Sequence, residues 1–357
     1  MGNLMACPRL KSGSRSSRRT RKMFQQLDPQ IQQQILAATV FYHQQQQQSG
    51  GGATGLNRST STRPAGRKKA SLLRSSSERP RSPYDDPLVQ PQQLVQEAEV
   101  DELGRKHFVL VHGGGFGAWC WYKTMALLEE AGFRVTAVDL AGSGVDSYDP
   151  NAVTSITQHM QPVTEFLEKL PKDEKVILVG HDLGGVFVSC AMEFFARKIS
   201  KAVFIAAVML TDGQSVLDAF QIQSGMNDLM QEIKTLLYAN GRNNPPTAIN
   251  FDRSLLKDLL FNKSPAKDVA LASVSMRPIP FAPFLEKLSL SEMNYGVVRK
   301  FYIETLEDNC IPNSVQESMV NGSPPERVFR LKGSDHCPFF SKPQALHKIL
   351  VQIAELA

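Results

Sequence analysis

The chain is poor in the features that mark secreted and membrane proteins. It contains five cysteines, none in a Cys-x-x-Cys pair: Cys7, Cys120, Cys190, Cys310 and Cys337. An odd number of cysteines without paired spacing gives no disulfide framework and fits a reducing compartment. No apolar run approaches the roughly 18 residues that a membrane-spanning helix needs, and no signal-peptide segment is evident. We therefore expect neither secretion nor a transmembrane segment.

Acidic residues are almost missing from the first part of the chain. Residues 1–80 contain 14 lysines and arginines but only two acidic residues, Asp28 and Glu78, which leaves 26 basic and 33 acidic residues in the remainder. The isoelectric point near 8.9 therefore comes from the N-terminal part and does not indicate a basic groove in the remainder. We expect no nucleic-acid partner.

Residues 1–99 also lack the apolar residues from which a core is built. Ser, Arg and Gly dominate residues 9–20 and 49–80, so we expect a mostly disordered extension. A composition rich in Arg and Ser and poor in acid is typical of an organelle transit peptide, here within about residues 1–80, and predicts a chloroplast location. Two alternatives stay open. One is lipidation of Gly2 and Cys7 at the plasma membrane, although Ala6 stands where that motif has Ser or Thr. The other is a cytoplasmic protein without a targeting signal.

Residues 100–357 alternate between strand and helix patterns. Strands are predicted at 107–111, 134–139, 176–180, 202–206, 300–305 and 327–331, and helices at 121–131, 155–170, 185–195 and 343–356. This alternation predicts an α/β domain with a mostly parallel sheet and helices on both faces. Residues 212–292 interrupt it with apolar residues at helical spacing in 217–220, 229–238 and 254–260. They predict an inserted helical cap over the carboxyl ends of the strands, where open α/β sheets bind ligands.

The segment Gly180-His181-Asp182-Leu183-Gly184 directly follows the apolar run 176–179. The pattern small-x-nucleophile-x-small between a strand and a helix is the nucleophile elbow of the α/β-hydrolase fold. Glycines are expected on both sides because larger residues would clash where strand and helix cross. The chain lacks a serine at the centre of this elbow and has Asp182 instead.

Two further residues in predicted loops complete a nucleophile, acid and base in the chain order of α/β-hydrolases: Asp182, Asp308 and His336. His336 would take a proton from the attacking group or from water, and Asp308 would fix its tautomer. Asp335 is the alternative acid, but as the neighbour of His336 in sequence it is expected to point away from it. His112 is expected to shape its own loop through hydrogen bonds.

Backbone donors are predicted from the glycine-rich loop after the first strand. The N–H groups of Gly114 and Leu183 are the expected oxyanion-hole donors, and Gly113 and Phe116 are expected to line the substrate pocket. The loop does not have the Gly-x-Gly-x-x-Gly spacing of a nucleotide site. Cys310, His336 and Cys337 are residue types that can bind a metal ion, but a catalytic triad explains His336 better than a metal site does. We therefore predict no cofactor and no metal.

Five sequence motifs together resemble the plant methylesterase family, which is related to the hydroxynitrile lyases. They are residues 112–121 (HGGGFGAWCW), residues 139–146 (DLAGSGVD), the Gly-His-x-Leu-Gly-Gly elbow, Ser264-Pro265 with Arg277-Pro278, and residues 332–336 (KGSDH). The resemblance covers about residues 103–357. It implies cofactor-free hydrolysis of methyl esters of plant hormones such as methyl salicylate, methyl jasmonate and methyl indole-3-acetate. A long basic extension resembles the plastid-targeted subgroup of this family.

The chain departs from the family pattern at Asp182, since Asp308 and His336 match the family's acid and histidine. A carboxylate that attacks an ester carbonyl is a poor nucleophile and would form a mixed anhydride, so esterase activity should fall by several orders of magnitude. Three hypotheses follow: a weakened methylesterase; a protein that binds a small apolar carboxylic acid or its methyl ester without turnover; and an aspartate-nucleophile hydrolase of the epoxide-hydrolase type. Against the third, Leu183 replaces the tryptophan of dehalogenases, and Tyr238 and Tyr295 are the only candidates for paired cap tyrosines. The sequence makes no prediction about oligomeric state.

Overall fold

The computed structural model describes residues 106–221 and 234–357, so the predicted extension and part of the cap lie outside the described residues. The main sheet has the strand order β2-β1-β3-β4-β8-β9, and every neighbouring pair is parallel. Its strands are β1 (His107–Val111), β2 (Arg134–Val138), β3 (Val176–His181), β4 (Ile199–Ile205), β8 (Arg299–Thr305) and β9 (Arg327–Leu331). The predicted parallel α/β architecture is confirmed.

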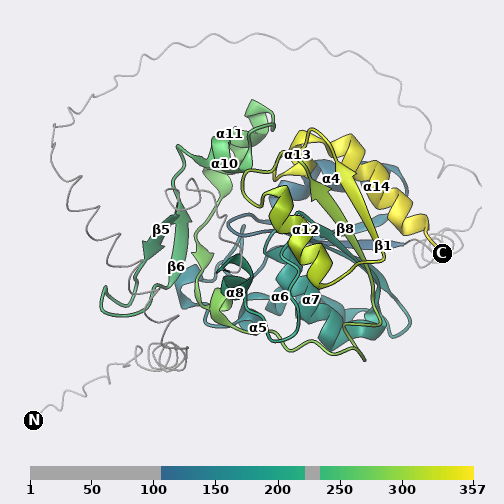
Figure 1. The fold of residues 1–357 in the computed structure, drawn as a ribbon, viewed down its shortest axis with the longest axis horizontal. Coiled ribbons are helices and arrows are strands. Elements are labelled where there is room, and N and C mark those ends of the chain that lie inside the picture. Colours follow the sequence, from purple (N-terminus) through teal and green to yellow (C-terminus); the bar gives the residue numbers. More distant parts are fainter. Residues whose placement is uncertain (1–105, 222–233) are drawn as a thin grey trace, which may run out of the picture. The chain divides into compact units, whose positions relative to one another are not determined.

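Helices cover both faces of this sheet, with α4 and α14 packed together on one face and α6 and α7 on the other (Figure 1). The α-helices of this layer are α4 (Tyr122–Glu130), α5 (Ile156–His159), α6 (Gln161–Lys169), α7 (Gly184–Phe195), α12 (Asn313–Gly322), α13 (Pro338–Ser341) and α14 (Pro343–Glu355). The single helix predicted at 155–170 is divided at Met160, because Pro162 occupies the first turn of α6 and has no N–H to continue a preceding helix. None of the described helices is long and apolar enough to cross a membrane.

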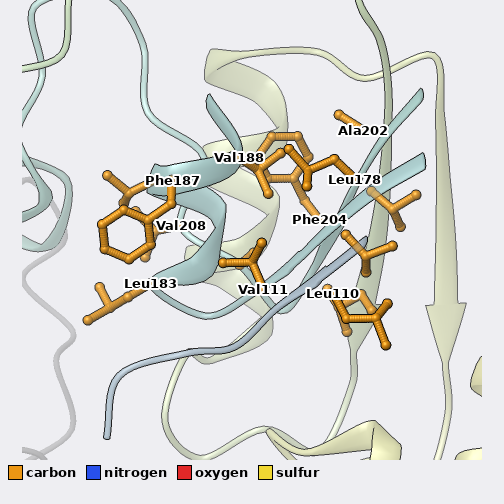
Figure 2. Packing of buried hydrophobic residues seen from close by; sticks show 14 of the residues in the cluster. Leu110, Val111, Leu178, Leu183, Phe187, Val188, Ala202, Phe204 and Val208 are labelled. Carbon is orange, nitrogen blue, oxygen red and sulfur yellow. The ribbon is translucent and has the colours of Figure 1, made fainter. Parts of the chain in front are cut away.

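The centre of the sheet is buried on both sides. All residues of β1 and β3 are buried, as expected for parallel strands that read as continuous apolar runs. Figure 2 shows Leu110, Leu178 and Ala202 on neighbouring strands, with Val188 of α7 beside Phe204 of β4. This tight packing fixes the end of β3, from which the elbow projects.

The cap is mixed and not purely helical, so the prediction of a helical cap is wrong in part. It contains α8 (Val216–Gln221), β5 (Lys234–Leu237), β6 (Ala248–Phe251), α10 (Leu256–Leu260), α11 (Ala266–Ser275), β7 (Ile279–Pro280) and the short 3-10 helix η5 (Ala282–Leu285). Part of the helix predicted at 229–238 is strand β5, which pairs antiparallel with β6. The Gly-, Asn- and Pro-rich segment 239–246 is a turn composition, and it favours a hairpin over a continuing helix.

Residues of two cap motifs, Ser264-Pro265 and Arg277-Pro278, form hydrogen bonds with loops of the main sheet. The Arg277 guanidinium donates to the backbone carbonyls of Asp146 and Tyr148 in the loop after β2. The Asp335 carboxylate, after β9, accepts hydrogen bonds from the Ser264 hydroxyl at 2.8 Å and the Lys263 N–H at 2.9 Å. The cap is therefore anchored from two directions over the strand ends.

Gly185, in the first turn of α7, allows a test of the steric crowding next to the elbow. A Cβ there would lie 2.3 Å from the Val208 carbonyl oxygen, whereas a Cβ at Gly322 would meet only Thr211 Cγ2 at 3.5 Å. We expect Gly185→Ala to lower the free energy of unfolding by about 1–3 kcal/mol, because overpacking outweighs the helix propensity of Ala. Gly322→Ala should change it by less than about 0.5 kcal/mol. Urea denaturation followed by circular dichroism measures both, and equal stabilities would contradict the steric account.

Candidate functional site

The elbow holds Asp182 in a strained backbone conformation. Its φ is +51°, in the left-handed region that residues with a Cβ rarely adopt, and its carbonyl accepts hydrogen bonds from Gly185 N–H at 3.1 Å and Val208 N–H at 2.9 Å. The neighbouring positions have no room for side chains: a Cβ at Gly180 would lie 2.7 Å from Val188 Cγ2, and one at Gly184 2.6 Å from the Val111 carbonyl oxygen. The predicted need for glycine on both sides of the nucleophile position is confirmed.

The two predicted oxyanion-hole donors bind the Asp182 side chain itself. Gly114 N–H donates to Asp182 Oδ2 over 2.8 Å, and Leu183 N–H also hydrogen-bonds this carboxylate. In a serine enzyme these two N–H groups stabilise the oxygen of the substrate's carbonyl. Here a side-chain oxygen of the elbow residue takes that position.

His336 and Asp308 form a buried pair. His336 Nδ1 lies 2.9 Å from Asp308 Oδ2, and both side chains are completely buried. Asp308 is held by the N–H groups of Cys310 and Ile311 and by the Thr305 hydroxyl. The structure thus places Asp308 against the histidine, while Asp335 turns to the cap as expected.

The other nitrogen of His336 faces the elbow. His336 Nε2 is 3.9 Å from Asp182 Oδ1 and is a buried atom without a hydrogen-bond partner. His181 fixes the backbone of His336, because His181 Nε2 donates to the His336 carbonyl oxygen over 2.8 Å. The centroids of the two imidazole rings lie 4.6 Å apart. His336 is therefore oriented by Asp308 and His181 together, with Nε2 available to a group bound beside Asp182.

Burial and charge shift the pKa values of both catalytic candidates. Burial raises the pKa of Asp182, and the His336 charge and the two backbone donors act against that rise. Burial alone lowers the pKa of His336, but Asp308 and Cys310 outweigh it and hold this pKa well above the usual range. Strongly shifted pKa values in one cluster of buried titratable groups indicate a functional site.

A small apolar hollow lies beside the elbow, between α7 and the cap. Its lining residues are His159, Leu183, Val186, Phe187, Val216, Ile279, Pro280, Pro283 and Phe284. Burial lowers the pKa of His159 to about 4, so this histidine is neutral near pH 7 and the hollow carries no charge of its own. The hollow has room for about one water molecule, so in this conformation it presents an apolar wall beside the elbow and does not enclose a ligand.

Gly113 and Phe116, the two residues predicted to line the substrate pocket, have different surroundings in the structure. Gly113 lies against the elbow, since a Cβ there would be 2.6 Å from Asp182 Cβ. Phe116 is fully buried, in edge contact with the rings of His181 and Phe339, and does not line the hollow. His112 donates from Nδ1 to the Gly113 carbonyl and accepts from Leu140 N–H at Nε2, and it shapes its loop as predicted.

Several supporting residues could not be found by motif. Gln316 links the Asp308 loop by donating to the carbonyls of Ile311 and Thr305. Lys234, on cap strand β5, interacts electrostatically with Asp182 and Cys310, which counters the lowering of its pKa by burial. Sequence offers no signal for Lys234, because its pattern resembled a helix and its partners lie far away in the chain.

Among the described residues, no group of three His, Cys, Asp or Glu side chains is placed to hold a metal ion. The strand, strained turn and helix, with an acid and a histidine on later loops and two backbone donors, define an α/β-hydrolase site. A model of the alpha/beta hydrolase family matches residues 108–349. The chain belongs to this family and, within it, to the plant methylesterases, as its relatives indicate.

The relatives are similar over most of the chain. "Putative methylesterase 11, chloroplastic" of Arabidopsis thaliana is 64% identical over 84% of this chain and 78% of its own length. Methyl jasmonate esterase 1 of Vitis vinifera is 39% identical over 71% of this chain and 91% of its own. The crystal structure of the Arabidopsis methylesterase MES16 covers 70% of this chain and 98% of its own, with 35% identity and a TM-score of 0.63.

The origin of the raised His336 pKa can be tested directly. The charged and titratable groups facing its ring are Asp308, Asp182, Cys310 and His181. Asp308→Asn should lower the His336 pKa, because the largest contribution that opposes burial is then removed. An NMR titration of the imidazole resonances measures this shift. An unchanged pKa would mean that Asp308 is not its cause.

Proposed function

We propose that the protein hydrolyses methyl esters of small apolar carboxylic acids, at rates far below those of a serine methylesterase. The observation that carries this proposal is the pairing of His336 with Asp308, aimed at the elbow residue and its two backbone donors. The apolar residues that line the hollow under the cap, Leu183 and Phe187 among them, would contact the body of such an ester. Methyl jasmonate esterase 1, a relative, is named for a substrate of this class.

The low rate follows from the place of Asp182 Oδ2. An ester carbonyl needs the Gly114 and Leu183 N–H groups to stabilise its developing charge, and these groups already bind the carboxylate. Loss of one oxyanion-hole donor alone costs about 10²–10³-fold in rate. Acyl attack on the substrate should therefore be slow even when the ester is bound.

The same observation favours a second candidate function, binding of a small apolar acid or ester without turnover. Occupied donors and a partly buried anion at the pocket floor would leave an uncharged ester as the preferred ligand. An epoxide-hydrolase activity is less well supported, since Tyr295 is buried and its hydroxyl lies 2.9 Å from the Ser323 hydroxyl. This hydroxyl does not serve as a free acid toward an epoxide.

We also infer import into the chloroplast. The support is the Arg- and Ser-rich, acid-poor composition of residues 1–80 and the chloroplastic names of relatives such as "Putative methylesterase 11, chloroplastic". Lipidation at the plasma membrane and a cytoplasmic location are the alternatives.

Replacement of the elbow residue tests the proposed function. We expect slow methanol release from aromatic and jasmonate-type methyl esters by the native protein, and at least about 10²-fold faster release by Asp182→Ser, which restores an alkoxide nucleophile and frees both donors. His336→Ala should reduce release to background in either form. If only Asp182→Ser turns over, the native protein is a binding protein. If Asp182→Ser is also inactive, the esterase assignment is wrong.

Targeting can be tested by fusing residues 1–99 to a fluorescent protein in leaf cells. We expect fluorescence in chloroplasts, unchanged by Gly2→Ala, because import depends on composition and not on an acylated glycine. Fluorescence at the plasma membrane that Gly2→Ala abolishes would establish lipidation instead.

A further inference from the structure

The two oxygens of Asp182 have different surroundings. Oδ2 accepts the Gly114 N–H at 2.8 Å, whereas Oδ1 lies 3.9 Å from His336 Nε2, beyond hydrogen-bond distance. The side chain keeps 14% of its surface exposed although its neighbours are buried. One oxygen is thus fixed in the oxyanion hole, and the other remains available as a nucleophile.

We propose that Asp182 cleaves methyl esters at the methyl carbon and not at the acyl carbon. This inference rests on the proposed function and names its reaction path. Oδ1 attacks the methyl group, a new Oδ1–CH3 bond forms, and the bond between that carbon and the ester oxygen breaks with its electron pair. The free carboxylate leaves with both of its original oxygens, and Asp182 becomes a methyl ester.

The second half of the reaction uses the rest of the site. In its neutral form, His336 removes a proton from water, and the hydroxide attacks Asp182 Cγ, so that negative charge develops on Oδ2. Collapse breaks the bond between Cγ and the methylated oxygen, and the methoxide takes the proton from His336 to leave as methanol. The regenerated carboxyl group loses its proton to solvent, so the sum is one ester and one water giving carboxylate, proton and methanol.

The geometry fits this path better than acyl attack. Acyl attack requires the ester carbonyl to displace the Asp182 carboxylate from the oxyanion-hole donors, whereas displacement at a methyl carbon requires only Oδ1. The Gly114 N–H then acts in the second half, because it already donates to the oxygen that becomes negative, and the Leu183 N–H interacts with the same carboxylate. His336, with Nε2 unpartnered and Nδ1 on Asp308, is oriented as the base for that water.

A cation on the cap also acts on the charge of the leaving carboxylate. Lys234 on β5 interacts electrostatically with Asp182, so its positive charge acts on the region in which the departing anion forms. A cation there stabilises charge that develops during displacement. Lys234→Met should slow methyl transfer without altering the hydrolysis of a methyl ester already formed on Asp182.

Hydrolysis in ¹⁸O-labelled water distinguishes the two paths. We expect no ¹⁸O in the product acid; the label should enter Asp182 in the first turnover and methanol from the second turnover onward. ¹⁸O in the acid would overturn methyl attack while leaving the proposed ester hydrolysis intact. If no ester releases methanol from the native protein, the proposed function and this inference both fail.

A trapping experiment tests the first step alone, with methyl 4-nitrobenzenesulfonate as the methyl donor and at a pH high enough to ionise Asp182 after the His336 charge is removed. His336→Gln cannot activate water, so it should accumulate a mass increase of about 14 Da, one methylene, that peptide fragmentation assigns to Asp182. The matched double variant, Asp182→Asn with His336→Gln, should carry no label at this position. Absence of the label from Asp182 in His336→Gln would overturn the proposal.

Discussion

The hydrogen bond from Gly114 N–H to Asp182 Oδ2 is the interaction on which the rest of the site depends. It joins the loop after β1 to the turn after β3. The two segments can approach each other this closely only because the loop has glycines, which carry no side chain, at the contact. A Cβ on Gly113 would overlap Asp182, and one on Gly114 would lie 2.8 Å from Leu183 Cδ1. The steric demand of the elbow thus determines where the carboxylate lies and which of its oxygens is free.

The buried charges are tolerable because each has a fixed partner. Asp308 receives two backbone N–H groups, a hydroxyl and the imidazole, and Asp182 receives two backbone N–H groups beside the same imidazole. A buried carboxylate without such partners would be protonated or would destabilise the fold. The site is therefore an electrostatic unit in which removal of His336 affects both carboxylates at once.

Sequence alone was sufficient for the sheet, the elbow and the identity of Asp182, Asp308 and His336 as neighbours, because these depend on local periodicity and on loops that parallel topology brings to one edge. It failed at β5, where an apolar stretch had helical spacing but paired with β6. It also missed the full burial of Phe116, because the rings of His181, Phe261 and Phe339 come from three distant segments. The direction of the Asp182 side chain could not be predicted either. Motif spacing predicts where the residue lies in the fold but not which groups its carboxylate oxygens contact.

In the proposed reaction, replacing serine by aspartate changes the carbonyl carbon on which the site acts. In a serine esterase the donors and the histidine act on the acyl carbon of the substrate, which becomes attached to the elbow only during the reaction. In this chain the elbow has its own carboxyl carbon, with Oδ2 already on the Gly114 donor and Oδ1 facing His336. The histidine, the acid and the donors therefore keep a chemical role without serine, provided that the substrate esterifies Asp182 through its alkyl group. A site that had only lost its nucleophile would have no need of a buried anion in its oxyanion hole.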